Sequence, residues 1–218
     1  LKLTGELSKT GIGGNWGTFI NNKQITKCDL TGVTGWGRTP TLPELAFMNC
    51  TALQEVTLPD DMKVIGTGAF SGCAALTTVN LSQVTWINLN AFYECTSLEM
   101  LILDNVTEIG REAFYGCTSL KTLKIPKCTR FGNYIVTGCK ALTRIEATAT
   151  GDFLDIIGNS SIENYAVFHN RDTHSGENAF APARCDLVLN TDKQEDGTAV
   201  PKVSGNNRWT LAANASPM

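Results

Sequence analysis

The sequence has little of what marks a membrane protein or a nucleic-acid-binding protein. No run of apolar residues approaches the ~18 that a membrane-spanning helix needs. Lys and Arg number 18 against 21 Asp and Glu, for a net charge of −3. This balance gives no basic field that would hold a phosphate backbone, so we expect no nucleic-acid partner. The chain begins at Leu1 without Met or a signal-peptide pattern. We therefore expect a trimmed or mature product that is soluble as it stands, with membrane contact only through an anchor upstream.

Motifs for catalysis are also absent from the sequence. It contains no G-x-S-x-G, no phosphate-binding glycine loop, no nucleotide fingerprint and no close C-x-x-C pair. Its 2 histidines belong to the one cluster of ligand-type residues, which consists of His169, Asp172, His174, Glu177 and Cys185. The His-x4-His spacing is not the i, i+4 spacing of metalloproteases, so we interpret the cluster as a solvated loop. We predict no enzyme, no cofactor and no metal site, and a metal-dependent enzyme at His169 and His174 is the remote alternative.

The dominant feature that the sequence does contain is an internal repeat. Five of its 8 cysteines are separated by 23, 22, 22 and 22 residues: Cys50, Cys73, Cys95, Cys117 and Cys139. An apolar pair ends three residues before each of these cysteines: Ala46-Phe47, Ala69-Phe70, Ala91-Phe92, Ala113-Phe114 and Ile135-Val136. Leucines follow at a constant distance, and one turn reads I-G-x-x-A-F-x-x-C-x-x-L-x-x-L-x-L-x-x-V-T-x. Regular spacing of this kind indicates a repeat architecture.

A period near 22 residues suits one strand and one short second segment in each turn. The L-x-x-L-x-L alternation predicts a strand with one buried face, and the spacing in A-F-x-x-C-x-x-L is typical of a single helical turn. A lone turn cannot bury both its edges, so the coils should stack with parallel strands about 4.8 Å apart. We therefore predict an α/β leucine-rich repeat solenoid. It would be a right-handed superhelix of about 22-residue coils, with a parallel β-sheet on the concave face and short helical or irregular convex segments.

This pattern resembles the BspA-like leucine-rich repeat family, which is typical of surface proteins of Bacteroides-type anaerobes. The match covers residues 25–147, with three nearly ideal turns between Ile65 and Ile125. The resemblance implies a bacterial protein that is extracellular or on the outer cell surface, secreted or lipid-anchored, and used for adhesion or protein contact. It is specific for the fold and says little about the ligand.

We expect one structural domain in three parts. Residues 1–24 would form an N-terminal cap, residues 25–147 about six solenoid turns, and residues 148–218 an irregular last turn and a C-terminal cap. In the first turn, Cys28 takes a strand position, and the extra segment from Arg38 to Pro43 is interpreted as a loop that bulges from the stack. A last strand is predicted from Cys185 to Leu189, after an enlarged loop.

The repeated cysteines are interpreted as small buried core residues. Equivalent positions on successive coils form a line, whereas zinc needs four ligands at tetrahedral corners. Their side chains would point in parallel into the core rather than toward each other, which disfavours disulfides. The thiols should therefore titrate only after denaturation.

The strand alternation predicts two outward columns on the concave face, the usual contact surface of solenoids. The columns are Lys27, Glu55, Thr78, Met100, Thr122 and Arg144, and Asp29, Thr57, Asn80, Ile102, Lys124 and Glu146. Met100 and Ile102 form an apolar centre within a polar rim, which is typical of a protein interface. The predicted partner-binding residues are Thr78, Asn80, Met100, Ile102, Thr122 and Lys124. The alternative, two scattered exposed apolar residues, stays open.

A third outward column, the x of V-T-x-I, would contain Gly35, Trp86, Glu108 and Arg130. An exposed Trp86 is suited to stack on a sugar ring or to anchor a protein, unless it folds over Ile87 or the coil above. We predict a non-enzymatic module for protein–protein interaction or adhesion, with a host extracellular or bacterial surface protein as partner. A carbohydrate-binding module that uses Trp86 is the alternative.

Overall fold

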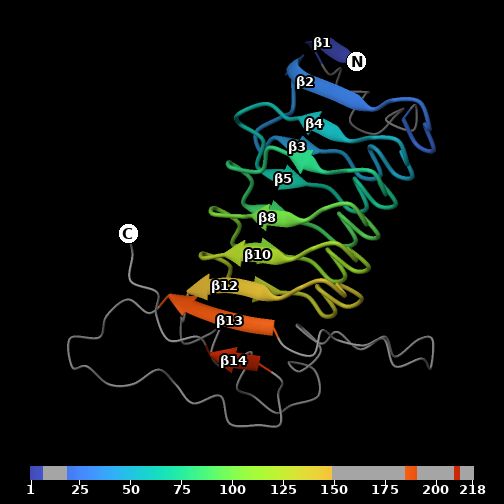
Figure 1. Cartoon of the computed structure of the whole chain (residues 1–218). Helices are drawn as coiled ribbons and strands as arrows, with labels where there is room; N and C mark the ends of the chain where they lie inside the picture. The colour runs from blue at the N-terminus through green and yellow to red at the C-terminus, as the bar shows by residue number, and fades with distance from the viewer. Residues whose placement is uncertain (7–18, 149–184, 191–208, 212–218) are drawn as a thin grey trace, which may run out of the picture.

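A computed structural model of the chain describes residues 1–6, 19–148, 185–190 and 209–211. The predicted loop with His169 and His174 lies outside these ranges, as does most of the two predicted caps. Within them, the chain forms short parallel strands that stack coil upon coil (Figure 1).

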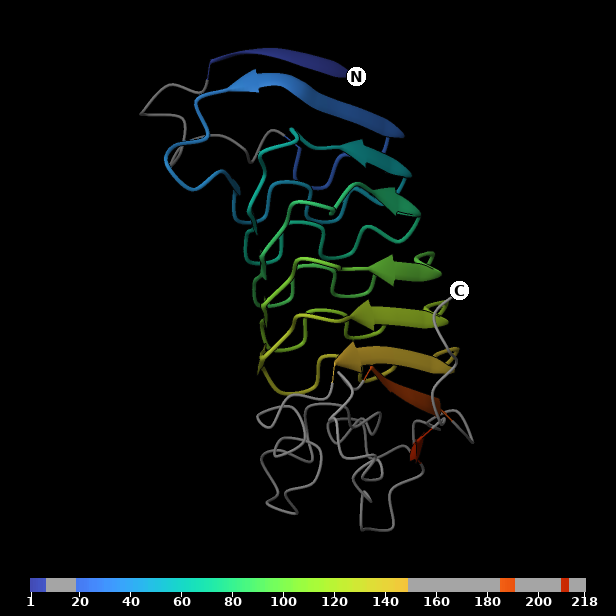
Figure 2. The same ribbon diagram turned by 90° about the vertical axis from the view of Figure 1, so that its left-hand side faces the viewer.

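The strands form two columns along the stack, and Figure 2 shows the first of them from the side. The first column contains β2 (Lys27–Thr34), β4 (Glu55–Thr57), β6 (Thr78–Val79), β8 (Met100–Ile102), β10 (Thr122–Ile125) and β12 (Arg144–Thr148). It is extended by β1 (Lys2–Glu6) beside β2, and by β13 (Cys185–Asn190) and β14 (Trp209–Leu211) beyond β12. The second column is one sheet of β3 (Thr41–Leu42), β5 (Val64–Ile65), β7 (Trp86–Ile87), β9 (Glu108–Ile109) and β11 (Arg130–Phe131). The predicted parallel solenoid is confirmed, including its last strand at Cys185.

The repeat fixes the register, because each inward residue stacks on its equivalent in the next coil. Leu101 of β8 pairs with Leu123 of β10, which pairs with Ile145 of β12. All three side chains are buried, with at most 4% of their surface exposed. The phenylalanines of the A-F pairs form a second inward column: Phe47, Phe70, Phe92 and Phe114 stack with ring centroids 5.1–5.8 Å apart, and Phe19 stacks on Phe47 at 5.5 Å. Burial of these repeated side chains holds the coils together.

The segments that carry the A-F pairs and cysteines contain no helix within the described residues. Each of them has two residues with a positive φ, one before the A-F pair and one before the cysteine. These residues are Leu45, Gly68, Asn90, Glu112 and Tyr134 in the first position, and Asn49, Gly72, Glu94, Gly116 and Gly138 in the second. Because two residues with left-handed backbone conformation lie four positions apart in each of these segments, no right-handed helical turn can form there. The helical option for these segments is therefore wrong, and they are hydrogen-bonded turns.

The backbone of these turns bonds in two directions. Every second N–H donates to the next coil, as Phe47 does to the Ala69 carbonyl at 2.7 Å and Phe70 does to the Ala91 carbonyl at 2.8 Å. The N–H groups between them bond locally, as Cys50 does to the Phe47 carbonyl at 3.0 Å. The turns thus pair across coils much as strands do, which satisfies buried backbone groups without a helix.

The segment from Arg38 to Pro43 in the first coil is not entirely the bulging loop that the sequence predicted. Thr41 and Leu42, placed in a bulging loop by the sequence pattern, form β3 and pair with Val64 and Ile65 of β5. Leu42 is completely buried. The added residues lie upstream, between the end of β2 at Thr34 and the start of β3. Leu42 precedes its A-F pair by the same four positions that separate Ile65 from Ala69, and this spacing is the signal that identifies the strand.

Candidate functional site

The outward side chains of the first strand column form what we call the first face. Met100 is followed along the stack by its paired neighbour Thr122 and then by Arg144. Ile102 is followed in the same way by Lys124 and then Glu146. Toward the N-terminus, Lys27, Glu55 and Thr78 stand in one line, and Asp29 pairs with Thr57. Within each of the two sheets, the strand pairing therefore gives the order that the repeat predicts.

Met100 and Ile102 are the large apolar side chains that the first face exposes within residues 27–147. Met100 is 57% exposed and Ile102 is 50% exposed, whereas Leu101 between them is 4% exposed. The alternation of β8 turns both apolar side chains to the same side of the sheet. Their neighbours in the next coil, Thr122 and Lys124, are half-buried and polar.

Asn80 is on the first face, but its side chain has a structural role. Its Oδ1 accepts a hydrogen bond from the Leu58 N–H at 2.6 Å, and its Nδ2 donates to the Leu58 carbonyl at 3.0 Å. The strand β6 has only two residues. The Asn80 side-chain amide adds two hydrogen bonds to the preceding coil beyond the end of this strand. The next strand of the column, β8, belongs to a separate sheet. The repeat pattern gives no sign of this role, because Asn80 occupies an outward position.

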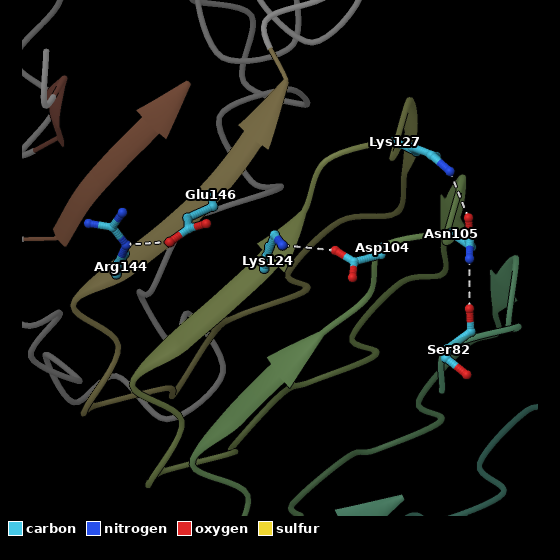
Figure 3. A network of polar contacts seen from close by, with 7 residues as sticks. All are labelled: Ser82, Asp104, Asn105, Lys124, Lys127, Arg144 and Glu146. Carbon is cyan, nitrogen blue, oxygen red and sulfur yellow. Dashed lines mark hydrogen bonds and ion pairs between the residues drawn. The ribbon is translucent and has the colours of Figure 1, made fainter. Parts of the chain in front are cut away.

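Charged side chains on and beside the first face are neutralised by ion pairs. The N···O distances are 3.7 Å for Lys2–Asp29, 2.7 Å for Lys27–Glu55, 2.8 Å for Lys121–Glu99, 3.1 Å for Lys124–Asp104 and 2.6 Å for Arg144–Glu146. Each pair joins one cation to one anion, so these five pairs together carry no net charge. Figure 3 shows the C-terminal part of this network, where Lys124 reaches sideways to Asp104.

A second chain of polar contacts follows the corner between the two strand columns. Lys127 Nζ donates to Asn105 Oδ1 at 2.7 Å, and Asn105 Nδ2 donates to the Ser82 carbonyl at 2.7 Å (Figure 3). Three successive coils are thus linked by side chains at this corner.

The second face consists of the outward residues of the second strand column. Its order by strand pairing is Thr41, Val64, Trp86, Glu108 and Arg130. Gly35 was predicted to belong to this column and does not, because the first coil enters the second sheet at Thr41. Trp86 is 40% exposed, while Ile87, the next residue of the strand, is fully buried. Beyond Trp86, the Arg130 guanidinium pairs with the Glu108 carboxylate at 2.7 Å.

The five repeated cysteines are completely buried. Each thiol donates to a carbonyl of the preceding coil, as Cys73 does to Phe47 at 3.0 Å and Cys95 does to Phe70 at 3.1 Å. Burial raises the pKa of Cys117 to about 12 and raises the pKa of Cys95 well above 9.0. These thiols are un-ionised hydrogen-bond donors at neutral pH. Cysteine fills this position because it is small enough for the core and still bonds the carbonyl above it.

The described ranges contain neither a cluster of metal ligands nor a membrane-spanning helix. No three His, Cys, Asp or Glu side chains gather there as ligands for a metal ion. No helix in those ranges is long and apolar enough to cross a membrane. The cluster from His169 to Cys185 lies outside them, apart from the backbone of β13.

The geometry described above belongs to a known class of repeat protein. Residues 18–143 match the BspA type leucine rich repeat region in 6 copies. The chain is therefore a member of the BspA-type leucine-rich repeat family. No curated protein matches it.

Solved structures with a similar chain are bacterial leucine-rich repeat proteins. A leucine rich repeat protein of T. pallidum is 25% identical with a TM-score of 0.51, over 56% of this chain and 58% of that one. A leucine rich cell surface protein of Faecalibacterium prausnitzii A2-165 is 28% identical with a TM-score of 0.42, over 56% of this chain and 38% of that one. A leucine-rich repeat protein of Bacteroides ovatus ATCC 8483 is 27% identical with a TM-score of 0.41, over 56% and 37%. The chain thus spans little more than half of the T. pallidum protein and less of the others.

Proposed function

We propose that this protein is a non-enzymatic binding module of the bacterial cell surface or the secreted fraction, and that its first face binds another protein. Family membership supports a binding role, because solenoids present extended surfaces to their partners. The name of the F. prausnitzii structure, a cell surface protein, supports the proposed location. One observation carries the choice of face: the exposed pair Met100 and Ile102 in the middle of an otherwise polar sheet surface.

The composition of the face favours an interface of ordinary type. Exposed apolar side chains at the centre lose water on binding, and a polar rim around them excludes solvent. Met100 adds a flexible thioether side chain that adapts to the shape of a partner. Thr122 borders it in the same column, and Thr78 holds the equivalent position of the preceding repeat. Both residues offer hydroxyl groups at the rim.

The ion pairs indicate what kind of partner the first face takes. Its cations already face anions at 2.6–3.7 Å, so a charged partner would have to compete with these contacts. The central positions, Thr57, Thr78, Met100, Ile102 and Thr122, carry no charge. We infer a partner surface that is apolar and uncharged at its centre, bound with little dependence on ionic strength.

The test compares the wild type with the variant Met100→Glu/Ile102→Asp in solid-phase binding to extracellular-matrix proteins and mucin. We expect the variant to bind its partner about 30-fold more weakly or worse, because it places two charges at the centre of the interface. Leu89→Glu is the matched control, since Leu89 is 41% exposed outside the first face. Equal affinity of the double variant and the wild type would show that the first face is not the binding site.

A further inference from the structure

We propose that the second face holds a separate site for a neutral saccharide, formed by Trp86, Glu108 and Arg130. This site goes beyond the protein-binding role of the first face. The three residues stand in one column on consecutive coils, in the order that the strand pairing gives. Parallel strands are about 4.8 Å apart, so the column extends roughly 10 Å along the stack from Trp86 to Arg130.

Trp86 supplies the platform of the site. Its indole is on the outward side of β7 and is 40% exposed, so a large part of the ring is accessible to a ligand. Its neighbour in the preceding coil, Val64, is only 6% exposed and adds almost no apolar surface. The accessible apolar area in the column is thus one ring wide. The apolar C–H face of a pyranose can stack on an aromatic ring of this size.

Glu108 and Arg130 supply the polar side of the site. The guanidinium Nη2 and the carboxylate Oε2 are 2.7 Å apart, with side-chain exposures of 72% for Arg130 and 30% for Glu108. The guanidinium carries five N–H donors and the carboxylate two acceptor oxygens, which is more than one N···O contact needs. The second oxygen accepts hydrogen bonds and the other N–H groups donate them, so together they suit neighbouring hydroxyl groups of a sugar.

The charge of the pair selects a neutral ligand. The Glu108 carboxylate would repel an anionic ligand that approaches Arg130, and the Arg130 guanidinium would repel a cationic ligand that approaches Glu108. A hydroxylated, uncharged ligand can bond both groups while their ion pair stays intact. A protein partner is less well suited, because protein hot spots need a wider area that loses its water on binding. Leu89, the other exposed apolar side chain of this coil, is outside the column.

The experiment titrates the whole chain with four neutral hexasaccharides, made of glucose, xylose, mannose and N-acetylglucosamine. Binding is followed by calorimetry and by the indole N–H signal of Trp86, which Trp86→Phe identifies in the NMR spectrum. We expect one probe to shift that signal, and Trp86→Ala to weaken its binding about 10-fold or more. Glu108→Gln should weaken it about 3- to 10-fold. Leu89→Ala, an equally exposed apolar residue, is the control and should leave the affinity unchanged.

The two proposed sites are tested independently. Met100→Glu/Ile102→Asp should retain saccharide binding, and Trp86→Ala should retain binding of a protein partner on the first face. The saccharide site is overturned if none of the four probes shifts the Trp86 signal at millimolar concentration. It is also overturned if Trp86→Ala binds the saccharide as the wild type does, or if Trp86→Ala abolishes binding to a protein while saccharides have no effect.

Discussion

The inward and outward columns of the same strands differ in how strictly they repeat. Inward positions hold Leu101, Leu123 and Ile145 at the same register, because each must fill the space left by its neighbours. Outward positions of the same strands change from Met100 to Thr122 to Arg144. The stacking of coils constrains one side only. The inward columns therefore encode the fold, and departures from the pattern on the outward side are where a ligand can be recognised.

The exposed apolar side chains of both faces lie in the same part of the stack. Within the described residues, the exposed large apolar side chains other than Leu1 are Trp86, Leu89, Met100 and Ile102. They fall on two successive coils, on either side of the corner at Ser82 and Asn105. Coils before and after expose polar and ion-paired side chains instead. The middle of the solenoid is thus the part whose surface differs most from its repeat.

The largest effect in this comparison is expected for the inward column. Phe92→Ala should lower the free energy of unfolding by about 3–5 kcal/mol, because Phe92 is fully buried between Phe70 and Phe114 with centroids at 5.1 and 5.8 Å. Urea unfolding followed by circular dichroism measures the change. Met100→Ala is the matched control and should stay within about 0.5 kcal/mol of the wild type. A similar loss for both variants would contradict the separation of inward and outward roles.

The repeat period predicted the strands, their register and the buried set, because a fixed period leaves few ways to stack. The turn conformation was not predictable from the same pattern. Leu45, Glu94, Glu112 and Tyr134 adopt positive φ although their side chains disfavour it by about 1 kcal/mol or more. The N–H groups of Leu45, Glu94 and Glu112 donate to the next coil, as Leu45 does to the Thr67 carbonyl at 2.9 Å. Hydrogen bonds between coils thus override the backbone preferences of these residues. A prediction from the sequence uses those preferences, so it missed the turn conformation.

The candidate sites show the same limit in another form. The repeat correctly ordered Met100, Thr122 and Arg144 in one column and Ile102, Lys124 and Glu146 in the other. It misplaced Gly35, because the insertion in the first coil was assigned downstream of its true position. It also gave no warning that Asn80 bonds the Leu58 backbone at 2.6 and 3.0 Å. A side chain that bonds the backbone of a neighbouring coil does not change the spacing of the repeat, so the pattern does not reveal it.

A smaller effect is expected when the buried thiols titrate. Their pKa values are raised by burial, to about 12 for Cys117, whereas an exposed thiol titrates near 9.0. Above pH 9 the unfolded chain loses thiol protons that the folded chain keeps, so stability falls as pH rises. Each such thiol should contribute at most about 1.4 kcal/mol per pH unit, a slope reached about one unit above pH 9. Urea unfolding at pH 8, 9 and 10 in reductant measures the slope.

The variant Cys95→Ala/Cys117→Ala isolates this contribution from other groups that titrate in the same range. Between pH 9 and 10 its loss of stability should be smaller than that of the wild type by about 2 kcal/mol, because the two thiols of the unfolded chain are already half ionised at pH 9. The folded wild type should also leave both thiols unreactive toward a thiol reagent at pH 8. Rapid modification of the folded chain would show that these cysteines are accessible, which contradicts their place in the inward column.

The smallest effect is expected for the ion pairs on and beside the first face. Lys121 and Glu99 are 2.8 Å apart, yet their side chains are 57% and 65% exposed. Water and salt screen such a pair, and ordering two long side chains offsets much of the attraction. A double-mutant cycle with Lys121→Ala and Glu99→Ala should therefore give a coupling of about 0.2–1 kcal/mol that disappears in 1 M NaCl. A coupling above about 2 kcal/mol would mean that outward pairs hold the coils together as inward side chains do. A small value leaves the pairs with a different role, which is to keep the first face neutral for an uncharged partner.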